Sequence, residues 1–464
     1  MALDQVRTSD ETVLETMANW AAEVSANWPD VAVDRAARAF EDTIACMIAG
    51  ADDLSPVKTR KGIANWGTGT STVVGQAAGA PAPWAAMANG TAAHALDYDD
   101  NVTIVLGHTS AVQVPALLAL GELTGATGRQ LIDAYIVGFE IQMALGRGVN
   151  WSHYNIGWHS TSTIIEIGTA GACARLLGLD RAGMAHAMSL ATSMACGPKA
   201  QFGSMAKSFH AGLAAQHAVT SAQLAEAGLE GRMEVLEAPM GFLELFGGKF
   251  PPGWENALDG FGDTLAILEY GVIPKRHPCC ASTHKCLDAV IDLRNEHGFS
   301  AGDVESVHTT VGSSNARNLS YDDPQNDREA KFSMQYCVAL GLVQDHLRIA
   351  DFAPEVVLRP EIRELIPRIT MDAFPAEAEK TGTPPDHEVS VRLKDGRVLE
   401  TTRAHPRGTI HDPLDADDRK AKYIDCVSGK LDDAAAEDLQ GLLAAFETVE
   451  DLDTIMKFLR FDAG

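Results

Sequence analysis

The chain has 464 residues, of which 46% are hydrophobic and 22% are charged. The length allows two or three domains or one large core, and the composition excludes disordered, collagen-like and disulfide-scaffold proteins. The formal net charge of −26 at pH 7 repels phosphate backbones, so we expect no nucleic-acid partner.

The first half of the chain predicts a large all-helical domain. From Thr12 to Ala227, apolar residues recur every three or four positions, and segments such as LLALGEL are apolar nearly all round. A helix with several apolar faces is buried by other helices, so we expect a helical core of several layers. The expected helices cover residues 11–24, 31–49, 83–96, 114–124, 128–147, 162–177, 180–196 and 210–228.

Strand patterns and helix patterns follow one another after about residue 270. Strands are expected over residues 304–311, 387–393 and 398–402, and helices over residues 282–296 and 330–343. The turn Lys394-Asp-Gly-Arg397 predicts that the last two strands form a hairpin. This mixture is typical of a small α+β domain.

The patterns together predict a mainly α protein with a large all-helical domain and a smaller α+β domain. Residues 415–459 return to helical spacing, and we expect them to pack on the first half of the chain. The all-helical domain is therefore assigned to residues 1–270 and 406–464, and the smaller domain to residues 271–405.

The cysteine pattern and the N-terminus favour a cytoplasmic protein. The eight cysteines are scattered and include no CxxC pair, which fits a reducing compartment. The opening sequence MALDQVRTSDETVLE carries acids where a signal peptide needs a basic start and an apolar stretch. No apolar run approaches the roughly 18 residues of a membrane span, so we expect no membrane partner.

Common cofactor motifs fail in this chain. No glycine follows Gly67-Thr-Gly69 at the spacing of a dinucleotide fingerprint, and Gly247-Gly-Lys249 lacks the spacing of a phosphate-binding loop. No nucleophile elbow, HExxH or EF-hand motif is present either. We therefore expect no cofactor, and chemistry must come from dispersed side chains.

An acidic cluster with histidines at residues 89–108 is the first candidate for such chemistry. Crowded carboxylates after an apolar helix repel one another, so a metal, a cation or buried hydrogen bonds must stabilise them. A helix cap or a solvated cluster is the favoured interpretation of such a cluster taken alone. A metal shared by His94, Asp97 and His108 is less favoured, because their spacing is not diagnostic.

Further candidates are His159, ahead of an expected helix, and Lys207, in a helical region rich in small residues. A helix N-terminus favours a neutral imidazole, which suits a general base. A structural histidine and a surface lysine are the plain alternatives. The stretches 275–284 and 331–336 add basic residues and a tyrosine, although adjacent Cys279 and Cys280 are also typical of inert buried thiols.

These residues together suit the removal of a proton next to a carboxylate. The chain is strongly acidic, so an anionic substrate needs a local cluster of Lys, Arg and His. Proton removal beside a carboxylate creates further negative charge, which fixed cations stabilise. A neutral His or an Asp then accepts the proton, and a second acid returns one.

At these motifs the sequence resembles the MmgE/PrpD family, whose members include 2-methylcitrate dehydratase, cis-aconitate decarboxylase and iminodisuccinate epimerase. The matching stretches are NGTAAHALDYDD (89–100), GHTS (107–110), GWHST (157–161), KSFHAG (207–212), HPCCASTH (277–284) and AKFSMQY (330–336). The resemblance implies a helical domain, a smaller lid domain, a homodimer, and an active site between the domains without metal or organic cofactor.

The resemblance also implies the site residues. The expected catalytic residues are Asp97, His108, His159, Lys207 and Tyr336. The expected substrate-binding residues are Asn101, Lys275, Arg276, Cys280 and His284. Thr109 and Ser160 stand where the family often has proline, and Asn101 stands where it often has Thr or Ser.

The leading hypothesis is a lyase of the 2-methylcitrate dehydratase type, acting on a small di- or tricarboxylic acid. An epimerase of the iminodisuccinate type needs the same proton abstraction, and a decarboxylase of the cis-aconitate type uses the same carboxylate clamp. A non-catalytic binding protein is the alternative from a different class. The sequence leaves these open, because small differences in distance decide the leaving group.

Overall fold

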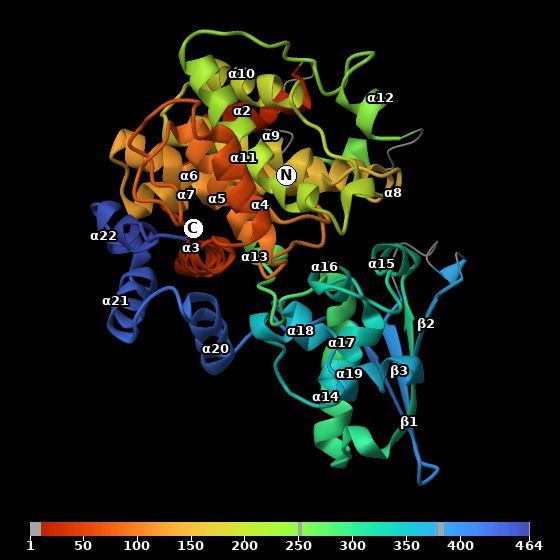
Figure 1. Ribbon diagram of the computed structural model, residues 1–464. Coiled ribbons are helices and arrows are strands. Elements are labelled where there is room, and N and C mark those ends of the chain that lie inside the picture. The colour runs from red at the N-terminus through yellow and green to blue at the C-terminus, as the bar shows by residue number, and fades with distance from the viewer. Residues whose placement is uncertain (1–10, 249–252, 376, 379–384, 464) are drawn as a thin grey trace.

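The computed structural model describes residues 11–248, 253–375, 377–378 and 385–463. Figure 1 shows two bodies, one built from helices of the N-terminal half and one built from a sheet with short helices. The last helices of the chain lie beside the first body. The fold is therefore mainly α with a smaller α+β part, which confirms the predicted fold class.

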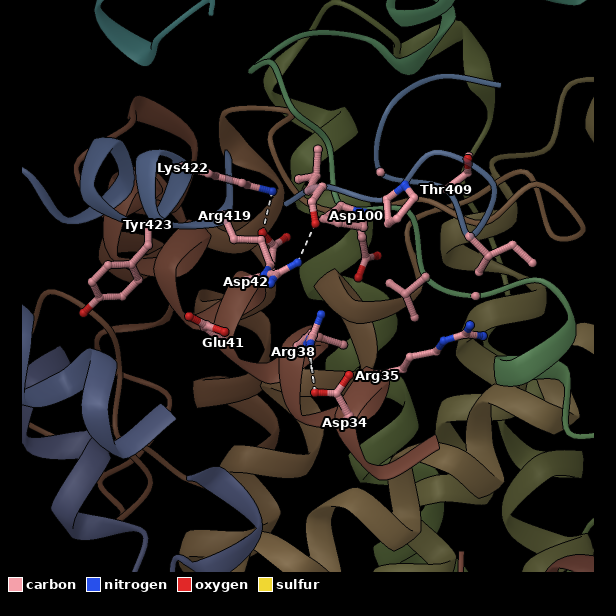
Figure 2. A pocket seen from close by; sticks show the side chains of 18 of the residues that line it. Asp34, Arg35, Arg38, Glu41, Asp42, Asp100, Thr409, Arg419, Lys422 and Tyr423 are labelled. Carbon is pink, nitrogen blue, oxygen red and sulfur yellow. Dashed lines mark hydrogen bonds and ion pairs between the residues drawn. The ribbon is translucent and has the colours of Figure 1, made fainter. Parts of the chain in front are cut away.

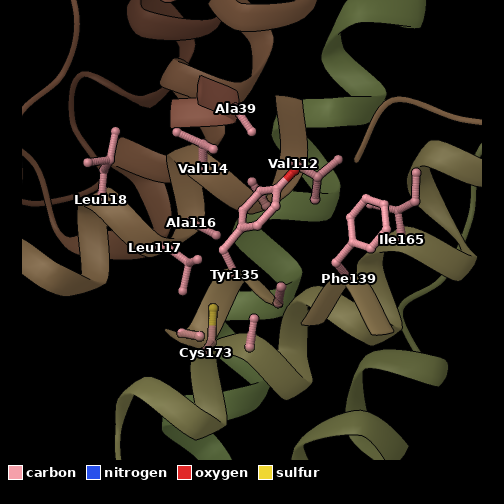
Figure 3. Close-up of a cluster of buried hydrophobic side chains, with 14 of the residues drawn as sticks. Ala39, Val112, Val114, Ala116, Leu117, Leu118, Tyr135, Phe139, Ile165 and Cys173 are labelled. Carbon is pink, nitrogen blue, oxygen red and sulfur yellow. The ribbon is translucent and has the colours of Figure 1, made fainter. Parts of the chain in front are cut away.

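The helices of the first body are α2 (Val13–Glu23), α3 (Asp30–Gly50), α4 (Leu54–Ile63), α5 (Ala82–Ala95), α6 (Thr109–Thr124), α7 (Gly128–Val149), α8 (Ser152–Asn155), α9 (Ile164–Leu176), α10 (Arg181–Thr192), α11 (Met205–Glu226), α12 (Phe242–Phe246) and α13 (Ala266–Glu269). Helices α5, α6, α9 and α11 are buried along most of their length. Figure 3 shows how side chains of α6, α7 and α9 meet in this core around Tyr135. The predicted layers of helix on helix are thus present.

Two helices begin earlier than predicted, and both changes concern the site. Helix α6 begins at Thr109 rather than at residue 114. Thr109 and Ser110 are polar, so the apolar pattern did not include them, yet both are fully buried. Helix α11 begins at Met205, where the side chain of Ser204 accepts a hydrogen bond from the Ala206 amide. Lys207 therefore lies in the first turn of α11. Helix α4 was not predicted.

The second body contains a four-stranded sheet in the order β2-β1-β3-β4. The strands are β1 (Val304–Val311), β2 (Ile369–Ala373), β3 (His387–Leu393) and β4 (Val398–Arg403). Strands β3 and β4 form the predicted hairpin, and β1 pairs antiparallel with β3 and parallel with β2. Strand β2 was missed, because only its first residue is buried and its pattern does not alternate.

Helices cover one side of this sheet and pack against it to form the core of the second body. They are α14 (Ala281–His297), α15 (Ser313–Asn318), α16 (Asp327–Ala330), α17 (Met334–Gly341), α18 (Pro354–Val357) and α19 (Pro360–Arg363). The predicted helices over 282–296 and 330–343 correspond to α14 and to α16 with α17.

The buried hydrophobic residues fall into two clusters. One joins residues 13–267 to residues 423–459, and the other lies within residues 279–393. Helices α20 (Ala416–Val427), α21 (Asp433–Ala444) and α22 (Asp453–Met456) belong to the first, where Phe446 stacks on Phe40 at 4.5 Å between ring centroids. We propose the domain boundaries near 270 and 405 on this ground.

None of the helices in the described part of the chain has the length and apolar character that a membrane crossing needs.

Candidate active site

The loop between α5 and α6 carries the acidic cluster into the interior. Helix α5 ends at Ala95, Asp97 follows with a positive φ of 55°, and α6 begins directly after His108. Asp97, Asp99 and Asp100 are all buried. The tertiary structure therefore excludes the solvated cluster that an isolated acidic stretch favours.

Asp97 binds two buried ammonium groups. Its Oδ1 accepts hydrogen bonds from Lys207 Nζ at 2.7 Å and from Lys275 Nζ at 3.0 Å. Lys275 also donates to the Asp97 backbone carbonyl at 2.7 Å. Burial would raise the pKa of Asp97, but the two lysines outweigh it and hold the pKa well below its usual range. Asp97 is therefore ionised.

His94 joins Lys207 to Asp99. Lys207 Nζ lies 2.9 Å from His94 Nε2, and His94 Nδ1 lies 2.9 Å from the Asp99 carboxylate. The ammonium can only donate, so Nε2 accepts and Nδ1 carries the proton that it gives to Asp99. Burial lowers the pKa of His94 to about 3 despite Asp99, so this imidazole stays neutral.

His108 presents a free nitrogen. Its Nδ1 lies 2.8 Å from the Asp100 carbonyl oxygen and 3.1 Å from Asp99 Oδ2. Both partners accept hydrogen bonds, so Nδ1 carries the proton and the lone pair of the neutral ring is on Nε2. Burial lowers the pKa of His108, which favours this neutral form. Nε2 is therefore the atom that can take a proton.

His159 is the second neutral imidazole. Its Nδ1 lies 3.1 Å from His210 Nδ1, and its buried Nε2 has no hydrogen-bond partner among the described residues. Burial and Lys207 hold the pKa of His159 well below its usual range. This supports the neutral imidazole that the sequence predicts at this position.

The imidazoles of His94, His108 and His159 form one group. The ring centroids of His94 and His108 are 4.2 Å apart, and that of His159 is 6.0 and 6.3 Å from them. One ligand atom from each lies within 4.8 Å of the others, a spacing that could hold a metal ion. The ammonium groups on Asp97 oppose a metal cation, so this geometry favours proton transfer over metal binding.

The two bodies meet at a cavity of about 30 Å³ beside this group. His94, Asp97 and Lys207 line one side, and Arg328 and Lys331 of the smaller body line the other. Residues from both bodies therefore line the candidate substrate cavity.

Two expected site residues make other contacts. The Tyr336 hydroxyl donates to the Asp351 carbonyl at 2.5 Å, and its ring is fully buried against Phe352. Its assignment as a hydroxyl donor is therefore corrected to a core position. Arg276 donates from Nε to Asp418 at 3.2 Å, and its Nη2 lies 3.0 Å from His346 Nε2. These contacts join the segment before α14 to α20, whereas Arg276 Nη1 is buried without a hydrogen-bond partner among the described residues, and its carboxylate-binding role stays a prediction.

Three expected substrate-binding residues remain, Asn101, Cys280 and His284, and their binding role stays a prediction. The Asn101 backbone pairs with the Ile273 backbone. This pairing holds the segment before Lys275 against the acidic loop. The Cys280 thiol is buried, and burial and Asp97 raise its pKa. His284 Nε2 lies 3.3 Å from the Cys279 carbonyl oxygen, so it serves the turn into α14.

Sequence reasoning left four site residues unassigned. They are His94, Asp99, His210 and Lys331. His210 follows Lys207 by three positions, so one helical turn brings both to one face of α11. That spacing could have identified it. Lys331 lies in the basic stretch 331–336 that the sequence singled out, but its position opposite Asp97 and Lys207 depends on the tertiary structure.

A larger cavity of about 330 Å³ lies behind the acidic loop (Figure 2). Asp100 lines it together with Asp42 and Lys422, and Lys422 donates to Asp42 at 2.6 Å and to the Tyr98 carbonyl at 2.8 Å. Its lining includes no histidine. It therefore lacks the acid–base groups of the smaller cavity, which we take as the candidate active site.

Comparison with known sequences agrees with the motifs. Residues 15–255 match the MmgE/PrpD N-terminal domain, and residues 277–448 match the MmgE/PrpD C-terminal domain.

Three curated relatives are named cis-aconitate decarboxylase. The mouse protein (Mus musculus) is 27% identical over 82% of this chain and 79% of its own length. The human protein (Homo sapiens) is 27% identical over 82% of this chain and 80% of its own length. The protein of Aspergillus terreus is 24% identical over 96% of each chain.

Proposed function

Because this chain belongs to the MmgE/PrpD family, we propose that it is a lyase acting on a small di- or tricarboxylic acid. One observation carries the proposal. Neutral His108 and His159, whose Nε2 atoms have no hydrogen-bond partner among the residues that the structure describes, lie beside ammonium groups gathered on Asp97. Such a set can hold carboxylates and move a proton at the adjacent carbon.

Charge balance supports an anionic substrate. The ionised carboxylates of Asp97 and Asp99 are matched by Lys207 and Lys275, and the imidazoles are neutral. Lys207 has three N–H donors and uses two of them, on Asp97 and His94. Its third donor is available to a substrate carboxylate. Each carboxylate that enters raises the proton affinity of the nearby imidazoles.

Decarboxylation is the reaction that we propose first, because relatives covering almost the whole chain carry that name. The bond from carbon to the departing carboxylate breaks, and CO₂ leaves. The electron pair moves onto the remaining carbon skeleton. An imidazolium, protonated as the substrate binds, then delivers one proton to carbon. The overall reaction takes up one proton and releases one CO₂.

Dehydration of a 2-methylcitrate-type hydroxy acid is the second candidate. One specific observation favours it, because the site holds a base and an acid separately. His108 Nε2 can take the proton from carbon, while the Lys207 ammonium can donate to a departing hydroxyl group.

The test incubates the protein in deuterated water with cis-aconitate or 2-methylcitrate and follows the acid by proton NMR. His159→Asn should lower turnover roughly 10²- to 10⁴-fold, the usual contribution of a general acid or base. His186→Asn is the matched control, because His186 contacts the Gly231 backbone outside the site. Its turnover should equal that of the wild type.

The products identify the reaction. CO₂ release with one deuterium in the product supports decarboxylation, and loss of water supports dehydration. Deuterium exchange without net conversion would instead identify an epimerase or isomerase. If no acid of this class reacts or exchanges, the lyase proposal is wrong and a binding protein is the better interpretation.

A further inference from the structure

The smaller body contributes a largely buried lysine, Lys331, to the lining of the candidate cavity. Lys331 is only 7% exposed, and its backbone is fixed because its carbonyl accepts the Cys280 amide at 2.9 Å. No hydrogen bond or ion pair joins its Nζ atom to any residue in the described part of the chain. A cation on a largely buried side chain without a direct partner is costly, so this group favours an anionic partner.

The position of Lys331 indicates where that partner lies. Lys331 lines the same cavity as His94, Asp97 and Lys207, on the opposite side. Burial lowers the pKa of Lys331, and the acidic residues Asp53, Asp327 and Asp97 offset this effect only in part. The nearby acids therefore leave its charge incompletely balanced.

Two further features of the cavity suit an anion. Gly203, Ser204 and Met205 line it at the N-terminus of the 22-residue helix α11, whose dipole is positive at that end. Arg328, one turn before Lys331, lines the cavity as well, and none of the described residues forms a hydrogen bond or ion pair with its guanidinium.

We propose that Lys331 binds the substrate carboxylate farthest from the reacting carbon, with Arg328 beside it. This inference rests on the proposed function. Lys207 would hold one carboxylate from the helical side, and Lys331 would hold another from the lid side. The substrate then bridges the two bodies, and an acid with a single carboxylate fills only one of the two positions. Lys331 is thus a specificity-determining residue.

The experiment measures binding of tricarballylate, an unreactive tricarboxylate, by isothermal titration calorimetry. Lys331→Gln should weaken binding roughly 10- to 100-fold, as expected for the loss of a charged hydrogen bond. Lys331→Arg keeps the charge and should bind within about threefold of the wild type. The matched control is Lys285→Gln, a half-buried lysine of the same body outside the cavity.

A second readout separates this role from a structural one. Removing an unpaired buried ammonium should raise the thermal midpoint of the ligand-free protein, whereas removing a structural ion pair would lower it. The proposal is therefore supported if Lys331→Gln is more stable and binds tricarballylate more weakly.

Failure of this inference and failure of the proposed function give different results. If the wild type and Lys331→Gln bind tricarballylate equally, Lys331 does not hold a carboxylate, while the lyase proposal stands. If Lys331→Gln loses stability, the residue is structural and the inference is wrong. If the wild type neither binds tricarballylate nor reacts with any acid tested, both proposals are overturned.

Discussion

Asp99 and Asp100 are adjacent in the sequence but differ in charge state. His94, His108 and Lys275 hold the pKa of Asp99 well below its usual range, although burial acts in the opposite direction. Burial and the carboxylates of Asp42 and Asp99 raise the pKa of Asp100 to about 7. The loop therefore directs the Asp99 carboxylate to the imidazoles of His94 and His108 and the Asp100 carboxylate toward the larger cavity behind them.

At the residue scale, we predict that Asp100→Asn stabilises the protein at alkaline pH. The pKa of Asp100 rises from 3.8 to about 7 on folding, so the folded state binds more protons between these values. Stability therefore falls as the pH rises through this window. Thermal midpoints of wild type and variant should agree at pH 4, and the variant should be higher at pH 8.

The control for this prediction is Asp34→Asn, at an exposed position of α3 that also lines the larger cavity behind the acidic loop. Its thermal midpoint should follow that of the wild type at both values of pH. Equal midpoints of Asp100→Asn and wild type at pH 8 would contradict the raised pKa.

Helices α5 and α11 bring His94 and Lys207 together, because glycines let their backbones approach closely. A Cβ atom on Gly90 would lie 3.0 Å from the Gly212 Cα atom, and a Cβ atom on Gly212 would overlap the Met87 carbonyl oxygen. The contact therefore depends on the absence of side chains at this crossing. The hydrogen bond between Lys207 and His94 follows from this packing.

At the element scale, Gly212→Ala should separate the two helices and cost roughly 1–3 kcal/mol or more of unfolding free energy. Because α11 carries Lys207 and His210, turnover should fall as well. Urea denaturation and a turnover assay measure the two effects. Gly441→Ala in α21 is the matched control, because its Cβ would meet nothing within 4 Å. Wild-type stability in Gly212→Ala would contradict close packing as the cause.

The last helices of the chain pack against the first body. Lys422 of α20 donates to Tyr98 in the acidic loop, 324 positions earlier, and forms an ion pair with Asp42 of α3. Lys422 and Asp42 line the larger cavity shown in Figure 2. The C-terminal helices therefore help to hold the acidic loop in place.

At the scale of the whole molecule, Lys422→Met should lower the free energy of unfolding by about 3–5 kcal/mol, because it leaves Asp42 buried without its partner. The double variant Lys422→Met/Asp42→Leu should recover most of this loss, since no charge then remains unpaired. Urea denaturation of the single and double variants forms a double-mutant cycle. A double variant as unstable as Lys422→Met would contradict the pairing.

The expected homodimer stays a prediction.

The sequence predicted the fold class, because it depends on local patterns, while the catalytic and binding roles of the site residues stay predictions. Periodic apolar residues indicated the helices, alternation indicated β1, β3 and β4, and the motifs placed Asp97, His108, His159 and Lys207 in one site. Those four residues do gather around the acidic loop. Strand β2 was missed because only its first residue is buried, and the early start of α6 was missed because its polar residues Thr109 and Ser110 are buried in the tertiary structure.

Only the tertiary structure decided which partner each side chain has. Arg276 and Lys275 are adjacent in a basic stretch, yet Lys275 lies on Asp97 while Arg276 reaches Asp418 in α20. Tyr336 belongs to a site-like motif, yet its hydroxyl donates to Asp351 within the lid. Local sequence determines backbone preference and side-chain type. The charge state and the partner of a side chain depend instead on burial among residues that lie hundreds of positions apart.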